Sequence, residues 1–210
     1  MSKDNLELLL RKNGRLNGRP FSETELERFL QYYHLVLKWN PRLHLTTLTA
    51  PETFFDRHLR ESEVVEAALL PEVAQVWDLG SGLGIPGIPL AVLRNDLPVT
   101  LVESKRHKAI FLEEVAATLN LKNLGVVNSR IESLELLPPF SCLTARAVEQ
   151  MRALIPFMLE LGENCVQILF LGSSRLIENV QTHLPSQFDL KPIPLPKSQD
   201  AFLISLTRST

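Results

Sequence analysis

A glycine-rich run occupies residues 80–87, directly after an apolar segment that begins at Val73. The run reads Gly80-Ser81-Gly82-Leu83-Gly84-Ile85-Pro86-Gly87. Glycines permit positive φ angles and let a ligand approach the main chain closely, and a helix that starts beyond them presents free N–H groups. A strand, a glycine loop and a helix in this order are typical of a nucleotide-type site. We therefore expect Gly80, Gly82 and Gly84 to contact a cofactor.

The position of Asp78 separates two classes of cofactor. Residues 82–87 formally match the G-x-G-x-x-G fingerprint of dinucleotide-binding proteins, but there an apolar strand runs straight into the first glycine. Here Asp78 ends the strand, two residues before Gly80. A carboxylate at that place repels a pyrophosphate and suits a cationic ligand that carries an α-amino group and a sulfonium centre. The sequence favours S-adenosylmethionine, and an NAD(P)-dependent oxidoreductase is the weaker alternative.

Acidic residues follow the next two predicted strands. Glu103 ends the second strand, where a carboxylate can accept hydrogen bonds from both ribose hydroxyls. The alternative for Glu103 is a surface acid next to Lys105. Glu132 follows the third strand, where an adenine would lie, although an acid in the first turn of a helix has the same pattern. We expect both carboxylates to bind the cofactor.

Arg146 lies in the fourth predicted strand, within an otherwise apolar segment. A buried arginine needs an anionic or polar partner. Ligands of α/β proteins bind at the carboxyl ends of the strands, where Arg146 lies. We therefore favour a role in the site, both catalytic and cofactor-binding, over a salt bridge in the core.

Basic residues are distributed unevenly along a chain whose formal net charge is −2. Residues 1–62 carry ten Lys or Arg against eight Asp or Glu, and a cluster without acids contains Arg11, Lys12, Arg15 and Arg19. A second cluster covers residues 105–108. These counts exclude a globally basic nucleic-acid binder and leave either a local phosphate-binding face or a solvated surface.

Helices are predicted throughout residues 1–70. The capping box Ser22–Glu25 and an apolar repeat predict a helix over 22–39, which Pro41 should stop. A shorter helix is expected around residues 6–10, and Pro51 should open a third helix that continues to Leu69. We expect these residues to form a helical cap. Trp39 either packs in its core or stacks on a ligand.

From residue 73 onward, short apolar strands alternate with helices. The predicted strands cover 73–79, 99–103, 126–129, 142–147 and 165–171, and the helices cover 85–93, 105–119, 149–160 and 174–183. Such alternation predicts a parallel sheet with right-handed crossovers. No helix separates the last two strands, 188–195 and 201–207, so they should form an antiparallel hairpin at the sheet edge. The fold class is α/β, with a seven-stranded, mostly parallel sheet.

The composition indicates an ordinary globular protein of the cytoplasm. Its longest apolar runs are far shorter than the roughly 20 residues that span a bilayer, and the first residues lack the apolar core of a signal peptide. Cys142 and Cys165 lie in apolar runs without nearby His or Cys, so we expect reduced core thiols and no metal site.

Several motifs together resemble the RsmG (GidB) family, bacterial guanine-N7 methyltransferases of small-subunit ribosomal RNA. The similar segments are Lys38-Trp39-Asn40, Arg57-His58, residues 78–89, residues 128–132 and residues 144–147. The resemblance implies a Rossmann-like class I methyltransferase domain over residues 71–210, packed with the cap over 1–70 as one compact unit. It also implies a set of residues that bind S-adenosylmethionine: Gly80, Ile85, Ile131, Glu132 and Arg146.

The resemblance further implies methylation of a guanine in the 530 loop of 16S rRNA. Guanine N7 has a free lone pair and needs no general base, which agrees with the lack of an obvious catalytic His or Cys. Basic side chains would hold RNA phosphates, namely Arg11, Lys12, Arg15, Arg19 and Arg57. We expect a monomer that acts on 16S rRNA or the small subunit. A cofactor-binding RNA assembly factor without catalysis is the alternative, suggested by the absence of a cation at Leu171-Gly172.

Overall fold

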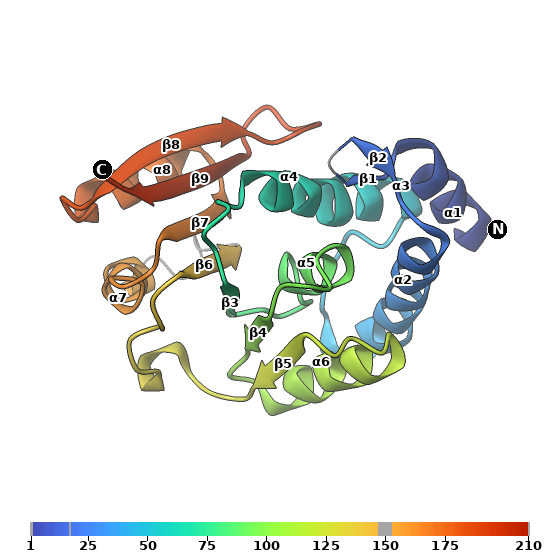
Figure 1. Ribbon diagram of the computed structural model, residues 1–210. Helices are drawn as coiled ribbons and strands as arrows, with labels where there is room; N and C mark the ends of the chain where they lie inside the picture. Colours follow the sequence, from blue (N-terminus) through green and yellow to red (C-terminus); the bar gives the residue numbers. More distant parts are fainter. Residues whose placement is uncertain (1, 17, 147–152, 210) are drawn as a thin grey trace.

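The computed structural model describes residues 2–16, 18–146 and 153–209 (Figure 1). Within these residues, the main sheet has seven strands in the order β5-β4-β3-β6-β7-β9-β8. The strands are β3 (Gln75–Leu79), β4 (Val99–Val102), β5 (Leu124–Val127), β6 (Ser141–Arg146), β7 (Gln167–Gly172), β8 (Phe188–Pro194) and β9 (Phe202–Arg208). The fold class predicted from the sequence is confirmed.

The strand order reverses between β3 and β6. The chain passes outward from β3 to β4 and β5, and β6 then returns to pair in parallel with the other side of β3. Such a reversal leaves a crevice at the carboxyl ends of the strands, where ligands of α/β proteins bind. The predicted hairpin is also confirmed, because β9 runs antiparallel to both β7 and β8.

Alternating side chains of the sheet enter two hydrophobic cores. On β3 and β6, Val76 and Cys142 belong to one core, whereas Leu79 and Leu143 belong to the other. This split follows the period of two by which strand residues face opposite sides. The helices α5 (Gly87–Leu93) and α6 (Arg106–Thr118) cover the first face, and α7 (Ile155–Leu161) and α8 (Ser174–His183) cover the second.

Up to Ala68, the described residues (2–16 and 18–68) are mainly helical and pack on the face of α5 and α6 (Figure 1). Their elements are α1 (Ser2–Asn13), the strands β1 (Arg15–Leu16) and β2 (Arg19–Pro20), α2 (Glu23–Leu43), α3 (Pro51–Phe54), η1 (Phe55–Leu59) and α4 (Arg60–Ala68). Their buried residues share one core with the sheet. The division of the chain into a cap and a methyltransferase domain at residue 70 stays a prediction.

Several helix boundaries differ from the sequence prediction, and two of these differences bear on the site. Pro41 does not stop α2, which continues to Leu43, because a proline in the last turn removes only one N–H donor. The N–H of His44 donates to the carbonyl of Asn40 at 2.9 Å and closes that turn. The predicted helix over 51–69 is interrupted by η1, a π-helical segment whose extra residue per turn changes which side chains face inward.

The remaining differences concern positions that sequence patterns leave open. The predicted strand over 142–147 ends at Arg146, and residues 147–152, where a helix was predicted to start, lie outside the described residues. Trp39 is a packing residue, because its ring meets Phe111 edge-on and its Nε1–H donates to Glu114 at 3.1 Å.

Both cysteines are buried free thiols, as predicted. In the described part of the chain, no helix is long and apolar enough to cross a bilayer.

Gly87 tests the close packing of α5 on the sheet. A Cβ added there would lie 2.2 Å from Leu101 Cδ2 and 3.0 Å from Asp78 Oδ2, and both of those side chains are fully buried. We expect Gly87→Ala to lower the free energy of unfolding by about 1–3 kcal/mol in urea denaturation. Gly125→Ala, where a Cβ meets nothing within 4 Å, is the matched control. Equal stability of the two variants would contradict this packing.

Candidate functional site

The loop between β3 and α5 has an unusual backbone. Gly80, Gly82 and Gly84 have φ angles of +68°, +53° and +92°, which residues with a Cβ rarely adopt. The N–H groups of Gly80 and Ser81 donate to the carbonyl of Val102 at 2.9 and 3.0 Å. The loop is therefore attached to the end of β4. Gly84 is also required for packing, since a Cβ there would lie 2.2 Å from Ile88 Cδ1.

Glu103 joins the loop to the neighbouring strand. One carboxylate oxygen accepts from the N–H of Gly82 at 2.9 Å, and the other accepts from the N–H of Lys105 at 2.8 Å. Only 6% of Glu103 is exposed, so the alternative of a surface acid is wrong. Each oxygen keeps a further lone pair with which it can accept a hydrogen bond from a ligand.

Asp78 lies beneath the glycine loop. Its side chain has no exposed surface, and its Oδ1 accepts a hydrogen bond from Thr144 Oγ1 at 3.1 Å. Burial raises the pKa of this carboxyl group to about 7. Asp78 is absent from the lining of the adjacent cavity. Its geometry is that of a support for the loop, so direct contact with a cationic ligand, as expected from the sequence, stays a prediction.

Ile131 and Glu132 follow β5 in a single turn of 3-10 helix, η2 (Ile131–Ser133). Ile131 is buried, Glu132 is exposed, and neither side chain lines the adjacent cavity. The turn follows the strand next to β4, which is where an adenine was expected. Contact of these two residues with a cofactor stays a prediction.

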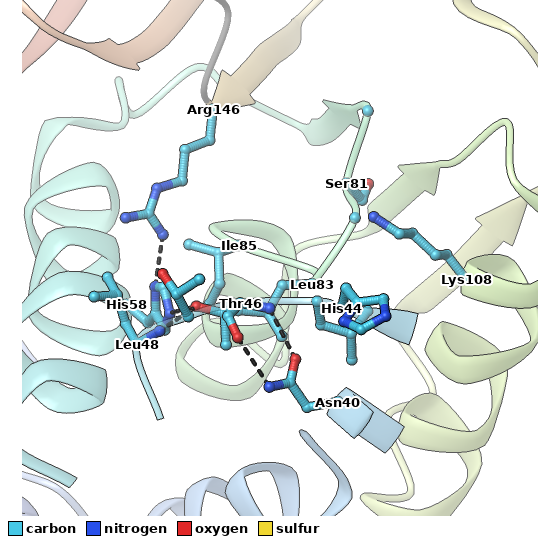
Figure 2. Close-up of a pocket in the computed structure, with 14 residues that line it drawn as sticks. Asn40, His44, Thr46, Leu48, His58, Ser81, Leu83, Ile85, Lys108 and Arg146 are labelled. Carbon is cyan, nitrogen blue, oxygen red and sulfur yellow. Dashed lines mark hydrogen bonds between the residues drawn. The ribbon is translucent and has the colours of Figure 1, made fainter. Parts of the chain in front are cut away.

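A cavity of about 700 Å³ lies between the glycine loop and the N-terminal helices (Figure 2). Its size falls within the range of roughly 300–1,000 Å³ that is common for ligand sites. The loop and sheet contribute Gly80, Ser81, Gly82, Leu83, Ile85 and Arg146, the helical segment contributes Asn40, His44, Thr46 and His58, and α6 contributes Lys108. Among the cofactor residues expected from the sequence, the structure thus brings Gly80, Gly82, Ile85 and Arg146 to one cavity.

Arg146 connects the sheet to the helical segment. Its guanidinium donates to Glu61 Oε2 at 2.8 Å, to the carbonyl of Arg57 at 2.6 Å and to His58 Nδ1 at 2.8 Å. Glu61 is 1% exposed, so this is a buried salt bridge. Arg146 thus forms the salt bridge that the sequence left as the alternative, and it also lines the cavity. Its catalytic and cofactor-binding role stays a prediction.

His58 continues the network from Arg146 to the cavity wall (Figure 2). A guanidinium only donates, so His58 Nδ1 must accept, and the ring proton lies on Nε2, 3.1 Å from Thr46 Oγ1. Asn40 holds the backbone of Thr46 by two hydrogen bonds of 2.9 Å. Burial and the charge of Arg146 lower the pKa of His58 to about 3. The imidazole is therefore neutral.

Three residues that line the larger cavity had no role expected from the sequence, namely Asn40, Thr46 and Lys108. Asn40 and Thr46 come from the end of α2 and the loop after it, far from the glycine loop in the chain. Lys108 belongs to the second basic cluster, for which the sequence left either a phosphate-binding face or a solvated surface. Their types suit a polar wall, but only the packing of α2 and α6 against the loop places them together.

Two arginines of the first basic cluster (residues 11–19) pair with acidic residues that lie outside the cluster in the sequence. Arg11 forms ion pairs with Glu7 and Glu23, and Arg19 forms one with Glu25. Arg15 donates to the carbonyls of Lys12 and Gly14, whereas the side chain of Lys12 is exposed. These four basic residues do not line the cavity. Their contact with RNA stays a prediction.

A second cavity, of about 310 Å³, lies at the carboxyl ends of β6 and β7. The helical segment contributes Arg57 and Glu61, which form a further ion pair at 2.9 Å. Arg146 lines this cavity as well as the larger one and lies at their boundary. In the described residues, no group of three or more His, Cys, Asp or Glu side chains could hold a metal ion.

Comparisons with known sequences identify close similarities. The model of the GidB family, described as rRNA small subunit methyltransferase G, matches residues 25–192. Ribosomal RNA small subunit methyltransferase G of Nitrosomonas eutropha is 33% identical over 172 residues, which are 79% of this chain and 78% of that protein. The protein of the same name from Pseudomonas fluorescens is 36% identical over 154 residues, 73% of this chain and 71% of that protein.

Solved structures share the fold at lower identity. A putative methyltransferase from Escherichia coli, yhhF, superposes with a TM-score of 0.57 at 23% identity, over 72% of this chain and 88% of that chain. A SAM-dependent methyltransferase from Aquifex aeolicus gives a TM-score of 0.56 at 14% identity, over 73% of this chain and 93% of that chain. These similarities concern the Rossmann-like fold.

The depressed pKa of His58 makes stability depend on pH. Its folded pKa of about 3 lies below its ordinary value of 6.5, so the unfolded chain binds a proton between these values while the folded chain does not. The stability is therefore complete above pH 6.5 and is lost as the pH falls. Relative to His58→Gln, we expect the wild type to lose about 1.4 kcal/mol of unfolding free energy per pH unit below 6.5.

Urea denaturation at pH 7, 6 and 5 measures this difference. His34→Gln is the matched control, because it removes an exposed imidazole from α2. A constant free-energy difference between wild type and His58→Gln across these pH values would contradict the neutral, buried state of His58.

Proposed function

Because the chain belongs to the GidB family, rRNA small subunit methyltransferase G, we propose that it methylates N7 of a guanine in the 530 loop of 16S rRNA. It is an enzyme, and its cofactor is S-adenosylmethionine, which supplies a methyl group on a cationic sulfur. The observation that carries the proposal is the positive-φ glycine loop, attached to Glu103 and open to a cavity of about 700 Å³.

The residues present fit this cofactor. Glu103 is held by two backbone N–H groups and keeps lone pairs for the ribose hydroxyls. The backbone at Gly80 and Gly82 lines the cavity without side chains that would block it. Further residues would contribute to the cofactor site, either by contact with the cofactor or by shaping the glycine loop. They are Asp78, Gly84, Ile85, Ile131 and Glu132. Arg146 would orient the site from the boundary of the two cavities.

The chemistry at guanine N7 agrees with the state of His58. N7 carries an available lone pair at neutral pH, so no protein group has to remove a proton. The lone pair of His58 Nδ1 is already occupied by Arg146, which leaves this imidazole unable to act as a base. Holding the two reactants in line can supply on the order of 7–11 kcal/mol of the barrier. Positioning is therefore the main task of the residues around the cavity.

The RNA must present its target base outside a stack. Enzymes that modify a base within structured nucleic acid act on an unstacked or flipped nucleotide. Lys12 is exposed and Arg57 is partly exposed, and both would meet phosphates in this proposal. Arg11, Arg15 and Arg19 would do so beside their present partners. The proposal includes a monomer that acts in the cytoplasm on 16S rRNA or the small subunit.

Transfer of a labelled methyl group tests the function directly. We expect labelled S-adenosylmethionine to modify small ribosomal subunits that lack the modification, and mapping to locate the label at N7 of one guanine in the 530 loop. Cofactor binding without any labelled RNA would instead support an assembly factor without catalysis. Label on a different base would keep the enzyme class and overturn the proposed target.

Glu103→Gln tests the cofactor site. The amide would present an N–H₂ group to the N–H of either Gly82 or Lys105 and would weaken acceptance from the ribose. Loss of a hydrogen bond to a charged group costs about 1.5–3 kcal/mol, so we expect roughly tenfold to hundredfold weaker binding of S-adenosylmethionine in calorimetry. Glu135→Gln, at an exposed position outside the cavity, is the control. Unchanged affinity of Glu103→Gln would remove Glu103 from the site.

A further inference from the structure

The smaller cavity adjoins the cofactor cavity but belongs to a different part of the sheet. Its floor and walls come from the ends of β6 and β7 and from the turn between β8 and β9. Leu171, Leu195 and Ala201 give it apolar walls, and all three are buried. Its volume of about 310 Å³ lies at the lower end of the range for ligand sites, which suits a small planar group.

Two carboxylates line this cavity, and they differ in what they can still accept. Glu61 is buried, and its two oxygens already face Arg57 at 2.9 Å and Arg146 at 2.8 Å. Asp200 is exposed, and its Oδ1 accepts from the N–H of Ser174 at 2.9 Å. Asp200 is therefore the carboxylate that can accept hydrogen bonds from a ligand.

Asp200 is also held in place before a ligand arrives. Ser174 begins α8 and anchors its carboxylate, and the N–H of Leu195 donates to the carbonyl of Ala201 at 2.8 Å across the turn. The hydrogen bonds from Ser174 lower the pKa of Asp200, so its side chain is ionised at neutral pH. An ionised, fixed carboxylate is a strong acceptor for two parallel N–H groups.

We propose that the smaller cavity holds the target guanine and that Asp200 accepts hydrogen bonds from its N1–H and N2–H groups. Among the four RNA bases, only guanine presents an N–H and an amino group side by side in this way. On the purine ring, the N2 amino group and N7 point in nearly opposite directions. A guanine held by Asp200 therefore directs N7 away from Asp200, and we place N7 toward the larger cavity.

Arg57 and Arg146, which also line the cavity, complete the recognition in this proposal. The O6 atom of guanine lies between N1 and N7, where a guanidinium group beside the base can reach it. Guanidinium groups donate to O6 and also stack on base planes. Asp200 is thus a specificity-determining residue, and the apolar side chains of Leu171, Leu195 and Ala201 can pack against the base. This inference rests on the proposed function, because it supplies the base pocket for that reaction.

A substrate in which inosine replaces the target guanine tests the contact between Asp200 and N2, because inosine lacks the N2 amino group. With small subunits assembled on such RNA, we expect the wild type to show a kcat/KM roughly 10- to 100-fold lower than with guanine. Asp200→Asn keeps an oxygen for Ser174 but replaces the other with a donor. We expect Asp200→Asn to lose a similar factor on guanine and little more on inosine.

Controls separate recognition from a structural effect. Asp189→Asn changes an exposed aspartate at the opposite end of the same hairpin and should leave both substrates unaffected. Affinity for S-adenosylmethionine, measured by calorimetry, should be equal in wild type and Asp200→Asn. If the losses in kcat/KM from inosine and from Asp200→Asn are not additive, Asp200 contacts the base directly.

The outcomes distinguish this inference from the function on which it rests. Transfer by the wild type that ignores the N2 amino group overturns the base pocket and leaves the methyltransferase intact. Additive losses from inosine and Asp200→Asn also overturn it, because Asp200 would then only support α8. Absence of any transfer by the wild type overturns the proposed function, and this inference with it.

Discussion

The ion pair and hydrogen bonds of the Arg146 guanidinium, whose side chain is 21% exposed, are the interactions on which the arrangement of both cavities depends. A charge is tolerated away from water only where hydrogen bonds and an opposite charge surround it. Glu61, His58 and the carbonyl of Arg57 supply those partners, and all of them belong to the N-terminal helical segment. The end of β6 is therefore fixed against that segment, and the side chain that joins them lies at the boundary between the two cavities.

The glycine loop is held by contacts from several directions at once. Glu103 and the carbonyl of Val102 bind it from β4, and Tyr32 on α2 donates to the carbonyl of Leu83 at 2.8 Å. A loop that is already ordered loses less conformational freedom when a ligand binds. Asp78 lies fully buried beside the loop, and its Oδ1 accepts a hydrogen bond from Thr144 on β6.

Most of the fold could be predicted, because strand and helix alternation with right-handed crossovers leaves few arrangements of the sheet. The glycine loop was predictable from residue types alone. The rest depended on tertiary packing. One extra residue in the turn at 55–59 leaves no clear sequence signal, yet it decides which side chains face Arg146. Likewise, Glu23 reaches Arg11 only because α1 and α2 fold against each other, and burial of Asp78 follows from the loop above it.

The end of α4 is tied to β7 by the side chain of Gln167, which accepts from the N–H of Leu70 and donates to the carbonyl of Ala68. These partners are separated by 97 and 99 residues of chain. During synthesis, at about 5–20 residues per second, the N-terminal helices leave the ribosome on the order of ten seconds before β7 exists. Until β7 is made, the end of α4 lacks these two hydrogen bonds, so this attachment of the helical segment to the sheet forms late.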